Sequence, residues 1–400
     1  MDKENERMQL LNTILNIVVL LLSLSVLICL HELGHLLVAK KFNVYCAEYS
    51  IGMGPLIYKR KKPGQETQFS VRAFPIGGFV AMAGEGSEDI EDFRDVPKER
   101  FLNNIARWKR ALIMVAGVTV NFLLSLVLFF VSGLCSPILD SSYLSVKVYE
   151  SNGSASYLAY EAGLTERDEI VKVQYVITIS DVPTTIESQI ETGRDLYTTF
   201  NLFAVESSSY YQSELASPNS EKDTWTWNLT TSENKEVSFT LNAKEQIVDH
   251  LFGVDEVVYV WDLSDIGIAF HTRNRNFVEG MNRAGDEFVS SITSFKVLFQ
   301  PGGWENLGGV LSVYSVSSYA TTVGFYYYLY VWGYISLNLA IVNLLPFPGL
   351  DGWHLVVCAF EGITRRDMPA KARQIMSVIG TVLLFGLMIF VTVLDVMRMF

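Results

Sequence analysis

The sequence predicts an α-helical membrane protein with four transmembrane helices and a β-rich domain outside the membrane. Half of the 400 residues are hydrophobic, and the mean hydropathy is positive. The apolar residues gather in long stretches without a charged side chain, each long enough for the roughly 20 residues that cross a bilayer. Between the second and third stretches lies an acidic block with strand-like runs. We therefore expect one part of the chain in the membrane and another in water.

Four uncharged stretches are the predicted spans, and the third is the longest. A cleaved signal peptide is the alternative for the first stretch, but its apolar run is long and the preceding MDKENER is not basic. The densest part of the third stretch is 325–345. The four stretches are 8–30, 111–139, 306–350 and 375–394.

The distribution of charge predicts the orientation of these spans. Residues 40–110 carry 13 Lys and Arg against 9 Asp and Glu, whereas residues 136–325 carry 11 against 26. The loop EGITRRDMPAKARQ (361–374) is short and basic. Because basic loops stay in the cytoplasm, we expect 40–110 and 361–374 inside, and the acidic block and both termini outside. The acidic balance argues against a nucleic-acid partner.

The motif LHELGHLL lies at the cytoplasmic end of the first predicted span. His31 and His35 are four residues apart, so a helix places both imidazoles on one face, with Glu32 beside them. This is the HExxH pattern, in which two neutral imidazoles bind Zn²⁺ and the glutamate is the general base. Ionisable groups inside a membrane span are costly, which favours a functional role. The alternative, a solvated helix end, explains neither the spacing nor the paired histidines.

A catalytic zinc usually takes three protein ligands and keeps one open position, so a third ligand is needed. The first and third spans run in the same direction, and the third ends in NLLPFPGLDGWHL (343–355), where prolines break the helix. Asp351 and His354 both lie there, and either would complete the site. Spacing alone favours Asp351, the only carboxylate between Glu305 and Glu361.

These motifs resemble those of the bacterial site-2 proteases, intramembrane zinc metalloproteases of the RseP/RasP type that carry a PDZ domain. The resemblance covers nearly the whole chain. HELGH (31–35) matches the family's HExGH, and NLLPFPGLDG (343–352) matches its NxxPxPxLDG. AGVTVN (116–121) resembles the family's AGPxxN segment, so Asn121 matches its asparagine. The chain departs from the family at Trp353, which replaces the second glycine of LDGG, and at Val118, which replaces the proline of AGPxxN. Neither position is a metal ligand.

The resemblance implies a site and a way of holding substrate. It assigns His31, His35 and Asp351 as ligands of one Zn²⁺ per chain and Glu32 as the catalytic base. FSVRAFPIGGFVAMAGE resembles a membrane-associated β-hairpin, here about 66–82 with a Pro-Ile-Gly-Gly turn, and implies that strand addition holds an extended substrate. The predicted substrate-binding residues are Asn343, Asn121, Phe74, Gly77 and Gly78. For the two asparagines, hydrogen bonding between helices is the alternative role.

The acidic block resembles the family's PDZ domain, with AGL (162–164) leading into a strand. Its strand-like runs are YLSVKVY, DEIVKVQYVIT, KEVSFTLNA and DIGIAF. We expect a PDZ-like domain interrupted by a polar loop insertion at 206–236, which either binds extended peptide or excludes bulky ectodomains. After it, apolar residues at helical spacing predict an amphipathic helix at the outer interface. The predicted domains are 1–135 with two spans and the hairpin, 141–272, the interfacial helix 276–300, and 325–400 with two spans.

The predicted function is regulated intramembrane proteolysis in the bacterial cytoplasmic membrane. The resemblance implies single-span substrates, such as anti-sigma factors or remnant signal peptides, that a site-1-type protease has first shortened outside. The lipid bilayer is the other expected partner. The alternatives are a non-catalytic zinc-containing scaffold that binds peptide through its PDZ domain, and a metal transporter. Glu32 argues against the scaffold because a structural site needs no base, and the single ligand cluster argues against the transporter.

Overall fold

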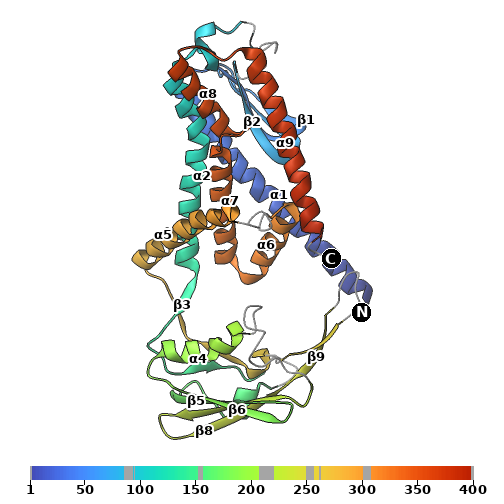
Figure 1. The fold of residues 1–400 in the computed structure, drawn as a ribbon, viewed down its shortest axis with the longest axis vertical. Helices are drawn as coiled ribbons and strands as arrows, with labels where there is room; N and C mark the ends of the chain where they lie inside the picture. The colour runs from blue at the N-terminus through green and yellow to red at the C-terminus, as the bar shows by residue number, and fades with distance from the viewer. Residues whose placement is uncertain are drawn as a thin grey trace. The chain divides into compact units, whose positions relative to one another are not determined.

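The chain folds into two compact units. A computed structural model describes residues 2–84, 93, 95–151, 156–206, 220–248, 256–260, 263–300 and 308–397. Unit 1 combines Met1–Ser136 with Asn276–Met399 and holds the long helices, whereas unit 2, Pro137–Arg275, is rich in β-strands (Figure 1).

Three of the described helices are long and apolar enough to cross a membrane. They comprise Leu10–Lys41 of α1 (Asp2–Lys41), the whole of α2 (Arg107–Cys135), and Ile375–Met397 of α9 (Ala370–Met397). Large apolar side chains such as Val382 and Ile389 are exposed along α9. In water such a surface would be costly, and it is typical of a helix that faces lipid. The protein is therefore a membrane protein.

The third uncharged stretch forms two helices rather than one. α6 (Val310–Val323) and α7 (Phe325–Leu344) meet at Gly324, whose φ of 133° lies in the region that favours glycine. α7 coincides with the part that the sequence marks as densest, although it is not among the three helices named above as long and apolar enough to cross a membrane. The chain then leaves the helix and begins α8 (Asp351–Thr364), which is followed by α9.

Two long strands follow α1. β1 (Cys46–Arg60) and β2 (Gln68–Met82) pair antiparallel, but residues 48–51 of β1 pair with 78–81 of β2 on one side and with 68–71 on the other. The first part of β1 therefore lies between the two ends of β2. The predicted hairpin within 66–82 is thus wrong, because the two ends of this segment pair with an inserted strand and not with each other.

The amphipathic helix expected at 276–300 is present as α5 (Phe277–Ser294), followed by the short helix η5 (Phe295–Phe299). Asn276 and Glu279 start α5 with reciprocal hydrogen bonds of 2.9 Å between side chain and backbone. Gly280 is buried on the face toward α2, and Asn282, two positions later and therefore on the opposite side of the helix, is exposed. Burial on one face fits the predicted amphipathic character.

α2 is the helix on which the rest of unit 1 packs, since it contacts α1, α5, α7 and α8 (Figure 1). Small residues permit the close approach. A Cβ added to Gly34 of α1 would lie 2.7 Å from the carbonyl oxygen of Ala116, and one added to Gly133 would lie 3.1 Å from that of Gly280. Glycine is typical of such tight helix contacts in membranes.

Unit 2 is built on a four-stranded antiparallel sheet in the order β6-β5-β7-β8. Each of the four predicted strand-like runs contains a strand, namely β4, β5, β8 and β11. Its elements are β3 (Pro137–Leu139), β4 (Val146–Val148), α3 (Leu158–Glu161), β5 (Ile170–Ile179), β6 (Val182–Gln189), α4 (Gly193–Glu206), β7 (Thr224–Thr231), β8 (Glu236–Asn242), β9 (Lys244–Val248), β10 (Glu256–Val260), η4 (Leu263–Ile266), β11 (Ile268–Phe270) and β12 (Thr272–Asn274).

The polar insertion predicted at 206–236 is wrong over its second half. β7 lies there, inside the sheet between β5 and β8. Its side chains alternate, with Trp225, Trp227 and Leu229 buried in the core of unit 2. The polar residues between them occupy the opposite face of the strand, which hides the strand in a segment of polar composition. Residues 207–219 of the predicted insertion lie outside the described residues.

Candidate metal centre

The two histidines of the HELGH motif lie one turn apart on α1 and face the same way. Their Nε2 atoms are 3.1 Å apart, and the rings meet edge to face with centroids 4.8 Å apart. His31 is 5% exposed and His35 is 4% exposed. A helix thus places both nitrogens at one point, as the spacing predicts.

Asp351 reaches the same point from a distant part of the chain. α7 ends at Leu344, because Pro346 and Pro348 cannot continue a helix, and α8 begins at Asp351 itself. Oδ2 of Asp351 lies 3.1 Å from Nε2 of His31 and 3.3 Å from Nε2 of His35. The structure therefore brings together the three predicted ligands.

His354, the other candidate for third ligand, has a different environment. It lines a small cavity together with Asn103, Arg110 and Met114. Among the described residues, the group of candidate ligands with atoms within 4.8 Å of one another contains His31, His35 and Asp351. The geometry thus selects Asp351, in agreement with the family resemblance.

The three donor atoms fit a zinc ion. They form a triangle with sides of 3.1, 3.1 and 3.3 Å. Tetrahedral zinc with bonds of about 2.0–2.1 Å holds its ligand atoms about 3.3 Å apart. Two imidazoles and one carboxylate leave a fourth position open, as catalytic zinc sites do.

The far side of each imidazole contacts α2. Nδ1 of His35 lies 2.8 Å from the carbonyl oxygen of Ile113. Because a carbonyl only accepts, this Nδ1 carries the proton, and Nε2 keeps its lone pair for a metal. Nδ1 of His31 lies 3.2 Å from the side-chain amide of Asn121. The sequence motifs do not reveal the role of Ile113, since a backbone carbonyl leaves no signal in residue type.

The predicted role of Asn121 as a substrate-binding residue does not fit this geometry. Its side chain is fully buried and lies against Nδ1 of His31, the nitrogen that faces away from the three donor atoms. A substrate held at the ligand side would not reach it. Asn121 therefore lies beside His31, on the side away from the three donor atoms.

β2 brings the backbone to Glu32. The backbone of Val80 hydrogen-bonds the half-buried Glu32 side chain. A Cβ added to Gly78 would lie 2.8 Å from the carbonyl oxygen of Ser50 and 3.7 Å from Cγ of Glu32. Glycine at 78 thus lets β2 pass between β1 and the side chain predicted to be the base.

The other predicted substrate-binding residues lie in two places. Asn343, near the end of α7, has its amide nitrogen 3.4 Å from Nε2 of His31, so it lies beside the donor atoms. Phe74 and Gly77 lie on β2, where Phe74 is exposed next to Gly54, and Gly77 packs against Met53. Of the five residues, Asn343 and Gly78 are therefore the ones on the reactive side of the site.

Gly117 of α2 lies directly against the two imidazoles. A Cβ added there would be 2.3 Å from Nε2 of His35 and 2.8 Å from Cε1 of His31. Both distances are below 3.0 Å, a separation from a non-bonded heavy atom that real Cβ atoms essentially never show. The absence of a side chain at 117 is thus a condition for the observed ligand geometry.

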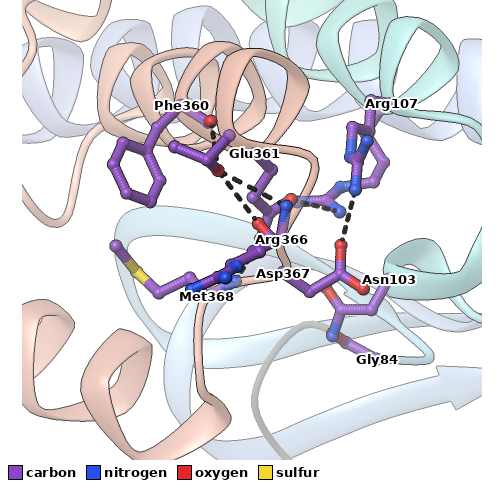
Figure 2. A network of polar contacts seen from close by, with 10 residues as sticks. Gly84, Asn103, Arg107, Phe360, Glu361, Arg366, Asp367 and Met368 are labelled. Atoms are coloured by element: carbon purple, nitrogen blue, oxygen red, sulfur yellow. Dashed lines mark hydrogen bonds and ion pairs between the residues drawn. The ribbon is translucent and has the colours of Figure 1, made fainter.

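Polar contacts anchor the end of α8 and the segment that follows it to the start of α2 (Figure 2). Arg110 lies 3.0 Å from Glu361, and both side chains are buried. The backbone N–H of Met368 donates to Glu361 at 3.0 Å, and Arg107 pairs with Asp367 at 3.0 Å. Removing one partner of a buried ion pair costs about 3–5 kcal/mol, so the Arg110–Glu361 pair fixes the far end of α8 firmly. Sequence reasoning missed this pair, although charges beside apolar runs are its signal.

Comparison with known proteins shows which family the chain matches. The model of peptidase family M50 matches residues 19–387. A protein of Clostridium perfringens named as a zinc metalloprotease is 28% identical over 389 residues, which are 95% of this chain and 98% of the relative. The zinc metalloprotease RasP of Shouchella clausii is 24% identical over 454 aligned positions, which cover 94% of this chain and 97% of that protein.

Proposed function

This chain belongs to peptidase family M50, and we propose that it cleaves peptide bonds within the membrane-spanning segments of single-span proteins. It is a zinc metallopeptidase of the membrane. The observation that carries the proposal is the convergence of His31, His35 and Asp351 on one point beside Glu32. The two histidines and the glutamate lie in α1, a helix apolar enough to span a bilayer. A site-2-type peptidase requires this combination.

The side chains around the site have distinct roles in the proposed reaction. His31, His35 and Asp351 would hold zinc, which when bound would supply a Lewis acid for the scissile carbonyl and for the attacking water. Glu32 takes the proton of that water and returns it to the leaving amine. The amide of Asn343, next to Nε2 of His31, donates a hydrogen bond to the scissile carbonyl oxygen as charge develops on it.

A membrane-spanning substrate must be unwound before its carbonyls become accessible, and β2 offers a place to hold it extended. Residues 78–81 of β2 pair with β1 on one side. Alternate residues of a strand direct their backbone groups to the same side, so Gly78 faces the side on which Val80 bonds Glu32. Strand addition at this edge would present the substrate backbone to the base, largely independently of its sequence.

We propose that α7 is the fourth span and that the metal site lies toward the cytoplasm. α7 has 20 residues, none charged, which is about the length that crosses a bilayer. The excess of Lys and Arg at 40–110 and the basic loop at 361–374 support a cytoplasmic location for both segments. Unit 2 and both termini then lie outside the cytoplasm. The membrane that the helices span is the bacterial cytoplasmic membrane.

We assign unit 2 as a PDZ-like domain that acts on the outer part of the substrate. Its antiparallel sheet and AGL segment support this assignment. Among the described strands, β6 pairs with β5 alone, so one of its edges is open to an extended peptide. The domain either binds that peptide or excludes bulky ectodomains, and a site-1-type protease shortens the substrate beforehand.

The proposal predicts cleavage that depends on metal and on substrate size. The purified protein, reconstituted in lipid, is mixed with a single-span substrate that carries either a large folded outer domain or a short outer stub. We expect the short form to be cut within its span, with mass spectrometry locating the new ends. A zinc chelator should stop cleavage, and added zinc should restore it. Failure to cut any of several shortened single-span substrates, with zinc bound, would overturn the proposal.

A further inference from the structure

We propose that Asn121 is a positioning residue for the metal site, whose side-chain oxygen accepts the Nδ1 proton of His31 and so keeps Nε2 free for zinc. The inference rests on the proposed zinc-peptidase function and adds a residue to it. Asn121 lies on α2, which contributes none of the three ligands, and its side chain is fully buried.

The proton on His31 has one place to go when the metal is bound. A neutral imidazole carries a single N–H, and Nε2 of His31 is a corner of the ligand triangle. Binding zinc through Nε2 therefore puts the proton on Nδ1. A buried N–H requires an acceptor, and the group at Nδ1 is the amide of Asn121, 3.2 Å away.

The orientation of the Asn121 amide follows from this requirement. In one orientation its nitrogen faces Nδ1, and Oδ1 is buried without a hydrogen-bond partner among the described residues. The oxygen and nitrogen of an amide occupy nearly equivalent positions, so a half-turn of the group exchanges them. That half-turn places Oδ1 at Nδ1 of His31 and matches the tautomer that binds zinc.

The two histidines are then held in the same way by one helix. α2 supplies the carbonyl oxygen of Ile113 to Nδ1 of His35 and the side chain of Asn121 to Nδ1 of His31. At Asn121, α2 is hydrogen-bonded to α7 through its backbone and not through the Asn121 side chain. The Ser336 hydroxyl of α7 donates to the backbone oxygen of Asn121 at 3.0 Å. The side chain of Asn121 is therefore not needed for that contact between helices, which was the alternative role for it.

The test compares zinc affinities of purified full-length variants by competition with a chelator. Asn121→Leu keeps the branched shape but has no acceptor, Asn121→Ala removes the acceptor without adding bulk, and Asn121→Asp keeps an acceptor. Outer partners of this kind change metal affinity by about 10- to 100-fold. We expect Leu and Ala to weaken zinc binding by that factor, and Asp to bind zinc at least as tightly as the wild type.

Ser125→Ala is the matched control. Ser125 lies one turn along α2, is equally buried, and donates to Phe122 within the helix, so its loss should leave zinc affinity unchanged. If Asn121→Leu binds zinc as tightly as the wild type, or if Asn121→Asp binds it more weakly than Asn121→Leu, a packing role explains the residue and the inference is overturned. If the wild type itself binds no zinc, the proposed function fails instead.

Discussion

Replacing Glu32 by Gln stops cleavage and leaves zinc bound. Gln has nearly the shape of Glu and still offers an oxygen to the backbone of Val80, but it cannot take a proton from water. Loss of a general base typically lowers kcat by about 10²- to 10⁴-fold. Zinc should remain because the three donor atoms belong to His31, His35 and Asp351.

Two measurements on the same purified sample check this prediction, namely zinc per chain and the cleavage rate of a short single-span substrate. Glu66→Gln is the control. Glu66 lies in the loop between β1 and β2 and pairs with Arg100, so its substitution should change neither quantity. Cleavage that persists in Glu32→Gln would show that another group is the base, and loss of zinc would show that Glu32 is a ligand. The inactive variant, expressed in its own cell, should also co-purify with its single-span substrates, which mass spectrometry can identify.

Replacing Gly117 by Ala removes zinc and activity together. The added methyl carbon would lie 2.3 Å from Nε2 of His35, so either the imidazole or α2 must move. α2 has little room to move, because Gly34 of α1 already lies against the backbone of Ala116. Displacement of even one ligand nitrogen breaks the triangle of donor atoms, and we expect zinc affinity to fall by more than the roughly 10- to 100-fold typical of an outer partner.

Zinc per chain and cleavage rate again report the outcome for Gly117→Ala. Gly386→Ala on α9 is the matched control, since its added Cβ would meet no atom within 4 Å and should change neither quantity. A Gly117→Ala protein with one tightly bound zinc per chain would mean that the imidazoles can shift without loss of the site. The close approach of α1 and α2 would then have no role in metal binding.

The sequence predicts the metal ligands well because each lies in a motif with local geometry. The spacing of His31 and His35 places both on one face of α1. The prolines before Asp351 end α7, and α8 begins at Asp351. That these segments meet depends on packing around α2, which no single motif encodes. For the same reason the contact of Asn121 with His31 could not be foreseen, since residue type indicates a buried polar group but not its partner.

Strand pairing was the harder part to predict. The pairing of β1 with both ends of β2 depends on contacts between segments up to 36 positions apart, from Cys46 to Met82. The family resemblance implied a local hairpin within 66–82 instead. β7 was hidden because Trp225 and Trp227 alternate with polar residues, in a segment whose overall composition is polar. A period of two over few residues is a weak signal. Likewise, Gly324 splits an uncharged stretch that contains no proline or charge at that point.

The central claim, that two distant segments hold one zinc, is tested most directly by the zinc content of Asp351→Ala beside that of His354→Ala. Both residues lie in the same short segment, and sequence spacing, although it favours Asp351, did not exclude His354 as third ligand. Oδ2 of Asp351 is 3.1 Å from Nε2 of His31, whereas His354 lines a separate cavity. We predict that the wild type and His354→Ala bind one zinc per chain and that Asp351→Ala loses it. Zinc retained in Asp351→Ala, or lost in His354→Ala, would contradict the account.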